Sequence, residues 1–163
     1  MTEINVKKAL QRLPYGLYGV TSRNGDEVNA MVITWITQVS FEPRMLAIAV
    51  QKSSYSYELI KKGQVFVLNI FNQEDFELIK PITKGRSKKP DKMEGIKYSM
   101  DSITGAPLLE DAAAYLECKV VNILDVGGDH NIIVGEVVGA SIKKPGETKD
   151  TLTLTNIGWS YAG

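Results

Sequence analysis

The sequence predicts a mainly β protein, built as a small barrel of six or seven antiparallel strands with a few short helices. Two observations predict it. Short runs of β-branched, aromatic and aliphatic residues recur along the 163-residue chain, separated by Gly, Asn and Pro turn signals. The last long run, residues 130–142, contains Gly135 and Gly139, and glycines inside a strand indicate the bends or bulges that closed barrels require. Many strands at such close spacing favour a barrel over a parallel α/β sheet.

The first elements along the chain are a short helix and a hairpin. Residues 4–13 have the apolar spacing of a short amphipathic helix, which Pro14 stops. The β-prone runs 15–22 and 28–35 are joined by the turn 24–26, which contains Asn-Gly. This arrangement predicts a β-hairpin.

The middle of the chain alternates strands with short helices. Residues 45–50 are a continuous apolar run, which predicts a strand buried on both faces, and residues 65–71 form another such run. Between them, residues 53–63 have serines at the start, lysines in the last turn and a closing glycine, so a capped helix is expected. Residues 74–82 predict a second short helix, and the basic, proline-interrupted stretch 84–92 predicts a long loop.

The C-terminal half reads as two longer strands. Polar and apolar residues alternate over residues 115–120, which places Leu116, Cys118 and Val120 on one face. Cys118 is therefore expected to be a small core residue and not a nucleophile.

Composition narrows the classes of function. The length indicates one domain, residues 1–163, and the 19 basic and 19 acidic side chains cancel, which argues against general affinity for nucleic acid. One cysteine and one histidine exclude an internal disulfide and make a protein-ligated metal centre improbable. No run approaches the ~20 apolar residues that span a bilayer, and no signal peptide is visible. We therefore expect a soluble, cytoplasmic protein.

Two polar segments next to buried strands predict a phosphate-binding corner. One is the run 34–40, and the other, Lys52 to Ser56, opens the predicted helix. Free N–H groups at a helix start, serine hydroxyls and a lysine suit a phosphate, and Arg86 in the basic loop could add a forked donor. The alternative is an ordinary serine cap with a solvated lysine and a solvated loop.

The single histidine, His130, follows Gly127, Gly128 and Asp129 and leads into an apolar strand. An imidazole titrates near physiological pH, so His130 is a candidate reactive or cofactor-facing group. The alternative is a turn in which the Asp129 side chain bonds nearby backbone and His130 is half exposed.

Several motifs together resemble one known family. Residues 29–43 carry a small residue and Trp, then a Ser near a Pro. They are followed in order by Val67-Leu68-Asn69, by residues 105–109, by Gly128-Asp129-His130 and by residues 135–137. This ordered set resembles the flavin reductase-like proteins of the FMN-binding split-barrel fold, within which the chain is most similar to flavoredoxin-like and high-molecular-weight rubredoxin-type flavoproteins. The resemblance implies a split β-barrel with Greek-key-like strand order.

The resemblance also implies a homodimer with FMN near the subunit interface. His130 matches the histidine that faces the nicotinamide or the flavin in NAD(P)H-using relatives, which implies a catalytic role. The resemblance also implies which residues bind the cofactor, by contacting its ring or its phosphate or by closing over it. They are Thr34, Trp35, Ile36, Thr37, Gln38, Val39, Ser40, Lys52, Ser53, Ser54, Ser56, Arg86 and Lys92.

These implications lead to an expected function. The chain is expected to be an FMN-binding flavoprotein oxidoreductase that passes electrons from NAD(P)H or a reduced redox protein to flavin, rubredoxin or another acceptor. Flavin would be either a substrate or a prosthetic group, and no nicotinamide fingerprint separates NADH from NADPH. The alternatives are a barrel that binds flavin or haem without turnover, since one fold hosts unrelated functions, and a dimeric structural partner domain.

Overall fold

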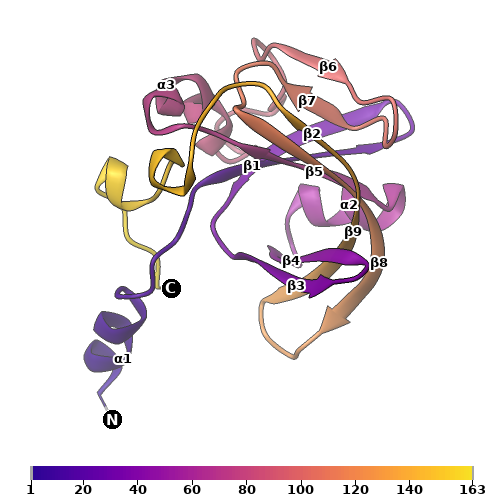
Figure 1. Ribbon diagram of the computed structural model, residues 1–163. Coiled ribbons are helices and arrows are strands. Elements are labelled where there is room, and N and C mark those ends of the chain that lie inside the picture. The colour runs from indigo at the N-terminus through magenta and orange to yellow at the C-terminus, as the bar shows by residue number, and fades with distance from the viewer. Residues whose placement is uncertain (1, 163) are drawn as a thin grey trace.

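The computed structural model of the chain describes residues 2–162. Its main feature is one antiparallel sheet of seven strands in the order β2-β1-β5-β8-β9-β4-β3 (Figure 1). This confirms the predicted mainly β class with few short helices. The strands are β1 (Tyr18–Asn24), β2 (Glu27–Ile33), β3 (Ile36–Phe41), β4 (Arg44–Gln51), β5 (Val65–Ile70), β8 (Ala114–Asp125) and β9 (His130–Ile142).

The connection between β2 and β3 shows why this sheet closes on itself. The two strands occupy opposite edges of the sheet, yet only Thr34 and Trp35 separate them in the chain. A chain segment extends by at most about 3.6 Å per residue, so the edges must come within roughly 11 Å of each other. The sheet therefore curls into a barrel with a split between β2 and β3, and Trp35 lies at that split.

The second sheet is the short hairpin of β6 (Tyr98–Met100) and β7 (Pro107–Leu109), which lies at the top of Figure 1 near α3 (Phe76–Ile79).

The buried apolar side chains form two separate cores. One contains Leu17, Val67, Phe71 and Leu109 with residues around α3, and the other contains Ile48, Phe66, Cys118 and Ile133 with residues of α2 (Tyr55–Gly63). None of the helices among residues 2–162 has the length and apolarity to cross a membrane.

Several predicted elements are confirmed, with instructive differences at their ends. The N-terminal helix is α1 (Glu3–Leu10), which projects away from the barrel and buries none of its residues (Figure 1). The predicted hairpin is β1 paired with β2, although its second strand ends at Ile33 and leaves Trp35 outside. The capped helix is α2, in which the Ser54 hydroxyl accepts from Tyr57 N–H at 3.1 Å.

The predicted helix over residues 74–82 breaks into three short pieces. They are a 3₁₀ turn at Gln73–Asp75, the four-residue α3 and a second 3₁₀ turn at Lys80–Thr83. Pro81 lies at the start of that second turn and cannot donate a backbone hydrogen bond to a continuing α-helix. Two further 3₁₀ turns, Thr148–Asp150 and Thr155–Ile157, follow β9.

The prediction for β4 is wrong in one respect. Its burial alternates along the strand, with Leu46, Ile48 and Val50 buried and their neighbours Ala47 and Ala49 only partly covered. The barrel is packed mainly on its inside. The large side chains of β4 point inward, and the small alanines lie on its less covered outer face. The face predicted for β8 is confirmed, because Leu116, Cys118 and Val120 join the same core. Burial raises the pKa of the Cys118 thiol to about 12, in keeping with a core residue.

A buried carboxyl group on β8 makes stability depend on pH. Glu117 is 5% exposed, and its Oε2 atom has no hydrogen-bond partner among residues 2–162. Gly139 lies opposite on β9, where a Cβ atom would come 2.3 Å from that oxygen. Burial, followed by the charge of Asp101, raises the pKa of Glu117 above its usual value. The protonated carboxyl is therefore the form that the fold favours.

We expect Glu117→Gln to become more stable than the wild type as pH rises. A raised folded-state pKa gives stability that is fully present below the unfolded-state pKa of about 4.3 and lost as pH rises through the folded-state value. The neutral amide escapes that loss, and the gain at pH 8 should be roughly 1–3 kcal/mol. Urea unfolding of both proteins from pH 4 to pH 8 measures it. Parallel pH profiles would contradict the prediction.

Candidate functional site

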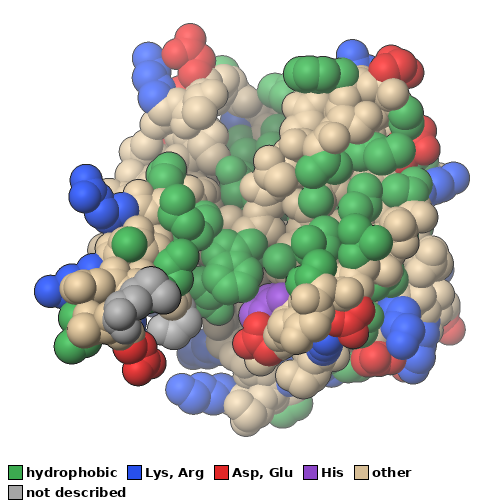
Figure 2. Space-filling view, turned by 90° about the horizontal axis from the view of Figure 1, so that it is seen from below, with side chains coloured by type: hydrophobic (Ala, Val, Ile, Leu, Met, Phe, Trp, Pro, Cys, Tyr) green, Lys and Arg blue, Asp and Glu red, His purple; other side chains and the backbone are tan. Residues whose placement is uncertain are grey.

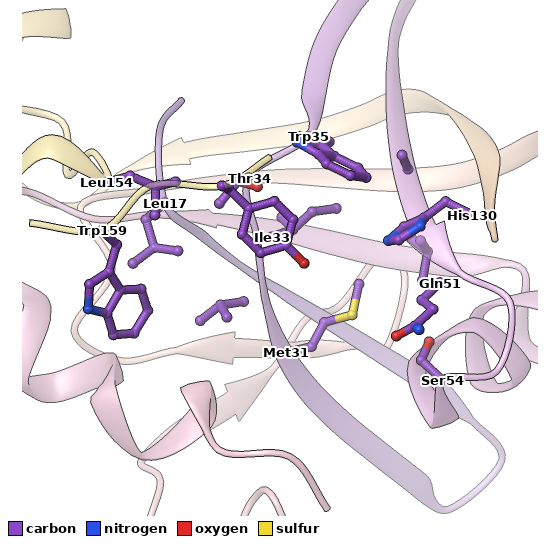
Figure 3. Close-up of a pocket in the computed structure, with 14 residues that line it drawn as sticks. Leu17, Met31, Ile33, Thr34, Trp35, Gln51, Ser54, His130, Leu154 and Trp159 are labelled. Atoms are coloured by element: carbon purple, nitrogen blue, oxygen red, sulfur yellow. The ribbon is translucent and has the colours of Figure 1, made fainter. Parts of the chain in front are cut away.

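A pocket of about 210 Å³ lies at the split of the barrel. It combines residues at the end of β2 and the β2–β3 connection, from the end of β4, from the start of α2 and β9, and from the C-terminal segment (Figure 3). Figure 2 shows apolar side chains gathered around the single histidine on this face, with charged side chains at the rim. The lining residues are Leu17, Met31, Val32, Ile33, Thr34, Trp35, Ala49, Val50, Gln51, Ser54, His130, Leu154, Trp159 and Tyr161.

Trp35 and His130 meet across this pocket (Figure 3). Their ring centroids are 4.9 Å apart, and the rings are tilted by 56°. Strand pairing produces the approach: Trp35 C=O accepts from Ala49 N–H on β4, and His130 lies opposite Gln51, two residues further along the same strand. The sheet thus carries two aromatic groups from distant parts of the chain to one place.

His130 is held by its neighbour in the chain. Its Nδ1 lies 2.8 Å from Asp129 Oδ1, and its side chain is 21% exposed. The hydrogen bond from His130, followed by its charge, holds the pKa of Asp129 below the usual value. When Nδ1 donates to Asp129, the other ring nitrogen, Nε2, is left for a ligand. The backbone of the turn is bonded by a different residue, Asp125, whose Oδ1 accepts from Gly127 N–H at 2.8 Å.

The start of α2 forms the polar end of the site. Ser54 lines the pocket as the N-cap, and Gln51 lies beside it (Figure 3). The first N–H groups of an α-helix have no acceptor within the helix, so those of Tyr55 and Ser56 are free of intrahelical bonds. Ser53, one residue earlier, is exposed. This end of the pocket therefore carries hydrogen-bond donors and the positive end of a helix dipole.

Two cations lie around this helix start, each with a partner. Lys52 Nζ is 2.7 Å from Asp125 Oδ1 at the end of β8, and that bond lowers the pKa of Asp125. Arg86 Nη1 donates to Asn29 Oδ1 at 3.0 Å, and its guanidinium lies 3.8 Å from the centre of the Tyr55 ring. The predicted basic loop, which has no helix or strand, therefore folds back onto α2.

Two of the predicted phosphate ligands are buried among protein partners. The Ser56 hydroxyl accepts from Asn29 Nδ2 at 2.6 Å, and Ser56 is 4% exposed. The Lys92 ammonium donates to the backbone carbonyls of Ile82 and Lys84. Burial, and then the nearby charges of Lys89 and Arg86, lower the pKa of Lys92.

The remaining predicted ligands follow β3 away from the pocket. Thr34 and Trp35 line the pocket, whereas Ile36, Thr37, Gln38, Val39 and Ser40 do not. β3 pairs with β4 on one side and forms an edge of the sheet on the other. The structure thus brings together Thr34, Trp35, Ser54 and His130 of the predicted set, with Lys52, Ser53 and Arg86 around the adjacent helix start.

Sequence reasoning missed the apolar half of the pocket. Leu17, Met31 and Ile33 belong to strands whose burial was expected, but nothing in their pattern shows that they face a ligand pocket. The C-terminal residues Trp159 and Tyr161 were also missed. Their only signal was two aromatic side chains, separated by one serine, just after Gly158.

Within the described part of the chain, no three His, Cys, Asp or Glu side chains gather closely enough to hold a metal ion. The residues at the pocket present aromatic rings, one imidazole, hydroxyl groups and, at the start of α2, backbone N–H groups.

Comparison with solved structures identifies the fold. A flavoredoxin from Methanosarcina acetivorans matches with a TM-score of 0.74 at 22% identity, covering 92% of this chain and 88% of that one. The NADH:FAD oxidoreductase of Streptomyces globisporus C-1027 matches with a TM-score of 0.76 at 23% identity, covering 92% and 80%. At such identities these matches establish the shared fold only.

Comparison with curated proteins gives closer sequence relatives. The chain is 34% identical over 142 residues to the high molecular weight rubredoxin of Moorella thermoacetica, covering 86% of this chain and 61% of that protein. It is 34% identical over 141 residues to diflavin flavoprotein A 1 of Synechocystis sp., covering 86% of this chain and 24% of that protein. The chain thus spans about a quarter to three fifths of the length of these relatives.

A family model supplies the remaining comparison. The model described as the flavin reductase like domain matches residues 10–160, nearly the whole chain. The match includes pocket residues from both ends of the chain, from Leu17, which directly precedes β1, to Trp159. The resemblance expected from the ordered motifs is confirmed, and the chain belongs to the flavin reductase-like domain family.

Proposed function

We propose that this chain is a flavin-binding oxidoreductase domain that holds FMN at the split of the barrel. One observation carries the proposal: the pocket joins the paired rings of Trp35 and His130 to the capped start of α2 at Ser54. An apolar slot next to a helix N-terminus suits a ligand that has a planar ring at one end and a phosphate at the other. Family membership and the named flavoprotein relatives support the same class of function.

The residues present fit such a group. Trp35 Nε1 is buried at the pocket and has no hydrogen-bond partner in the described part of the chain, whereas buried polar atoms normally have one. A carbonyl or nitrogen acceptor on the rim of a flavin ring would satisfy it. For the phosphate we propose the N–H groups at the start of α2, the hydroxyls of Ser53 and Ser54, and the charges of Lys52 and Arg86. Ser56 and Lys92 would shape this corner from within, because their polar atoms already have protein partners.

Bound flavin would supply the electron- and hydride-transfer chemistry. The protein's part is to position the ring and stabilise charge. In our proposal His130 faces the reacting ring through Nε2, and Asp129 is a positioning residue that holds the imidazole. Thr34, which lines the pocket, would donate to the ring as charge develops on it. Residues 36–40 do not line the pocket, so their backbone N–H groups would contact a part of the flavin that extends past Trp35 along β3. Since β3 is an edge strand, its outward N–H groups have no partner strand among residues 2–162.

The exposed edge also supports a homodimer. On β3, Val39 is 50% exposed and Phe41 is 87% exposed, and an open apolar strand edge invites pairing with another chain. We propose that a second copy covers this edge next to the flavin site. Residues 1–163 would act as one domain, with NAD(P)H or a reduced protein as electron donor. Flavin, rubredoxin or another carrier would be the acceptor.

The visible spectrum of the purified protein tests the proposal. We expect flavin absorbance, or its appearance after addition of FMN, and mass spectrometry of the released chromophore should identify FMN. NADH oxidation with and without free FMN then separates flavin as a substrate from flavin as a prosthetic group. A colourless protein that does not bind FMN would end the proposal. A yellow protein that is inert to NADH and NADPH, and whose flavin stays oxidised with reduced rubredoxin, would favour a non-catalytic barrel.

We expect His130→Ala to slow NAD(P)H-dependent flavin reduction by about tenfold or more, since an oriented charged or hydrogen-bonding group at the reacting ring is lost. The FMN dissociation constant should change by less than about threefold, because the phosphate corner is untouched. Stopped-flow reduction and fluorescence titration measure the two quantities. Tyr98→Ala, which replaces a partly exposed aromatic ring on β6 outside the pocket, is the control. An unchanged reduction rate would remove His130 from the mechanism.

A further inference from the structure

The C-terminal segment forms one wall of the pocket and is held to the molecule unevenly. Leu154 N–H donates to Tyr15 C=O at 3.1 Å, which ties the segment to the chain before β1, and Trp159 N–H donates back to Leu154 C=O at 3.0 Å within the segment. The Trp159 ring also packs edge-on against Phe76, with centroids 5.8 Å apart. This part of the segment is anchored.

Beyond Trp159 the anchoring stops. Among the residues that the structure describes, the only hydrogen bond to residues 160–162 runs from Gln11 Nε2 to Ser160 Oγ, at 3.3 Å and exposed to solvent. Gly158, just before the anchored ring, has φ +70° and open space around its Cα, so the chain turns sharply there. A segment with so few bonds opens at low cost in free energy.

Tyr161, in this weakly held part, contacts the centre of the site. Its ring lies 5.3 Å from the Trp35 ring in an edge-to-face arrangement, and it lines the same pocket as His130 and Ser54. Trp35 therefore has an aromatic neighbour on two sides, His130 and Tyr161. The side chain of Tyr161 is part of the pocket wall, yet the residue is 48% exposed, so its displacement uncovers little core.

The pocket is small for the ligand proposed above. Its volume of about 210 Å³ lies below the roughly 300–1,000 Å³ of pockets that enclose a ligand of this size. The barrel walls around Ile33, Ala49 and His130 are β-strands with regular pairing and cannot retreat without breaking the sheet. The C-terminal wall is the part that can move, and Tyr161 is the large side chain on its free portion.

We propose that Tyr161 is an aromatic gate, which occupies space beside Trp35 in competition with the planar ring of the ligand. The inference rests on the proposed function, because the ligand ring is that of FMN. With the gate closed, Tyr161 contributes the edge contact to Trp35; with the gate open, the ligand ring takes its place. The apparent affinity for ligand is then the intrinsic affinity reduced by the fraction of molecules in which the gate is open. Trp159, packed against Phe76, stays in place, and the chain after it moves when the gate opens.

The test is stopped-flow mixing of the flavin-depleted protein with FMN, followed by flavin fluorescence, together with equilibrium titration. Tyr161→Ala removes the competing ring, whereas Tyr161→Phe keeps the ring and removes only the hydroxyl. Tyr98→Ala is the matched control, a partly exposed aromatic ring on β6 that does not line the pocket. Circular dichroism checks that each variant is folded.

We expect Tyr161→Ala to speed FMN association and to lower the dissociation constant by about threefold to tenfold, the range expected when one aromatic contact stops competing. Tyr161→Phe and Tyr98→Ala should remain within about twofold of the wild type. Unchanged binding in Tyr161→Ala would overturn the gate. Weaker binding would overturn it as well, since Tyr161 would then cover bound FMN and not compete with it. A wild-type protein that does not bind FMN would overturn the proposed function together with the gate, and this outcome is distinct from the other two.

Discussion

Gly63→Ala is expected to lower the free energy of unfolding by roughly 3 kcal/mol or more, because the added methyl group would clash with backbone atoms that cannot move aside. Gly63 is the last residue of α2, and a Cβ atom there would lie 1.7 Å from the carbonyl oxygen of Arg23 on β1. The sequence predicts this glycine as the residue that closes the capped helix. In the structure the left-handed C-cap is Gln64, with φ +60°, and Gly63 lies where helix and strand approach closely.

Equilibrium unfolding in urea, followed by far-ultraviolet circular dichroism, measures the effect. Gly85→Ala is the matched control, since the nearest heavy atom to its added Cβ would be 3.9 Å away and its φ is ordinary. We expect that control to lie within about 1 kcal/mol of the wild type, on the stabilising side. A Gly63→Ala protein as stable as the wild type would show that α2 does not sit on β1 as described, and the helix start that lines the pocket would then be misplaced too.

Lys144→Met is expected to cost roughly 2–4 kcal/mol, because it leaves a buried carboxylate without its cation. Asp75 has a side chain only 9% exposed, and Lys144 Nζ lies 3.0 Å from its Oδ1. The same ammonium donates to Asp111 C=O at 2.8 Å. One cation thus ties the chain after β9 to the 3₁₀ turn before α3 and to the turn before β8. Methionine keeps the length of the side chain and removes these bonds.

Lys149→Met provides the comparison, since Lys149 pairs with Glu147 at 3.3 Å and both side chains are 76% exposed. That loss should be below about 0.5 kcal/mol. Adding Asp75→Asn to Lys144→Met should recover part of the stability, and the double-mutant cycle gives the coupling energy of the pair. If Lys144→Met and Lys149→Met cost the same, the buried pair does not hold these segments together.

Local pattern predicted most of the strands, because side chains alternate across a sheet whatever its neighbours are. Residues 130–142 were predicted as one strand, and β9 spans His130–Ile142. The Asn-Gly turn gave the β1–β2 hairpin for the same local reason. The prediction failed where the environment decides: β4 reads as a doubly buried run, but its alanines lie on the partly open side of the barrel.

The site could be predicted only in the parts that carry polar chemistry. Ser54 at a helix start and His130 after a glycine pair have local signals, and the structure brings both to one pocket. Arg86 and Lys92 belong to the same basic loop and have similar sequence surroundings, yet Arg86 reaches α2 while Lys92 is turned inward to backbone carbonyls. The sequence pattern does not predict which of the two side chains turns inward, because that depends on which backbone carbonyls the folded loop brings near each of them.

The amino-acid sequence by itself determined the mainly β class, the hairpin, the capped helix, the core position of Cys118 and the family. Periodicity and turn chemistry act within a few residues of the chain, and the family follows from the order of short motifs along it. Only the tertiary structure decided that Thr34 and Trp35 join opposite edges of one sheet, and that Tyr161 reaches the ring of Trp35. Closure of the barrel depends on the pairing of all seven strands together. It therefore fixes how close residues far apart in the chain come at the split, which no local pattern contains.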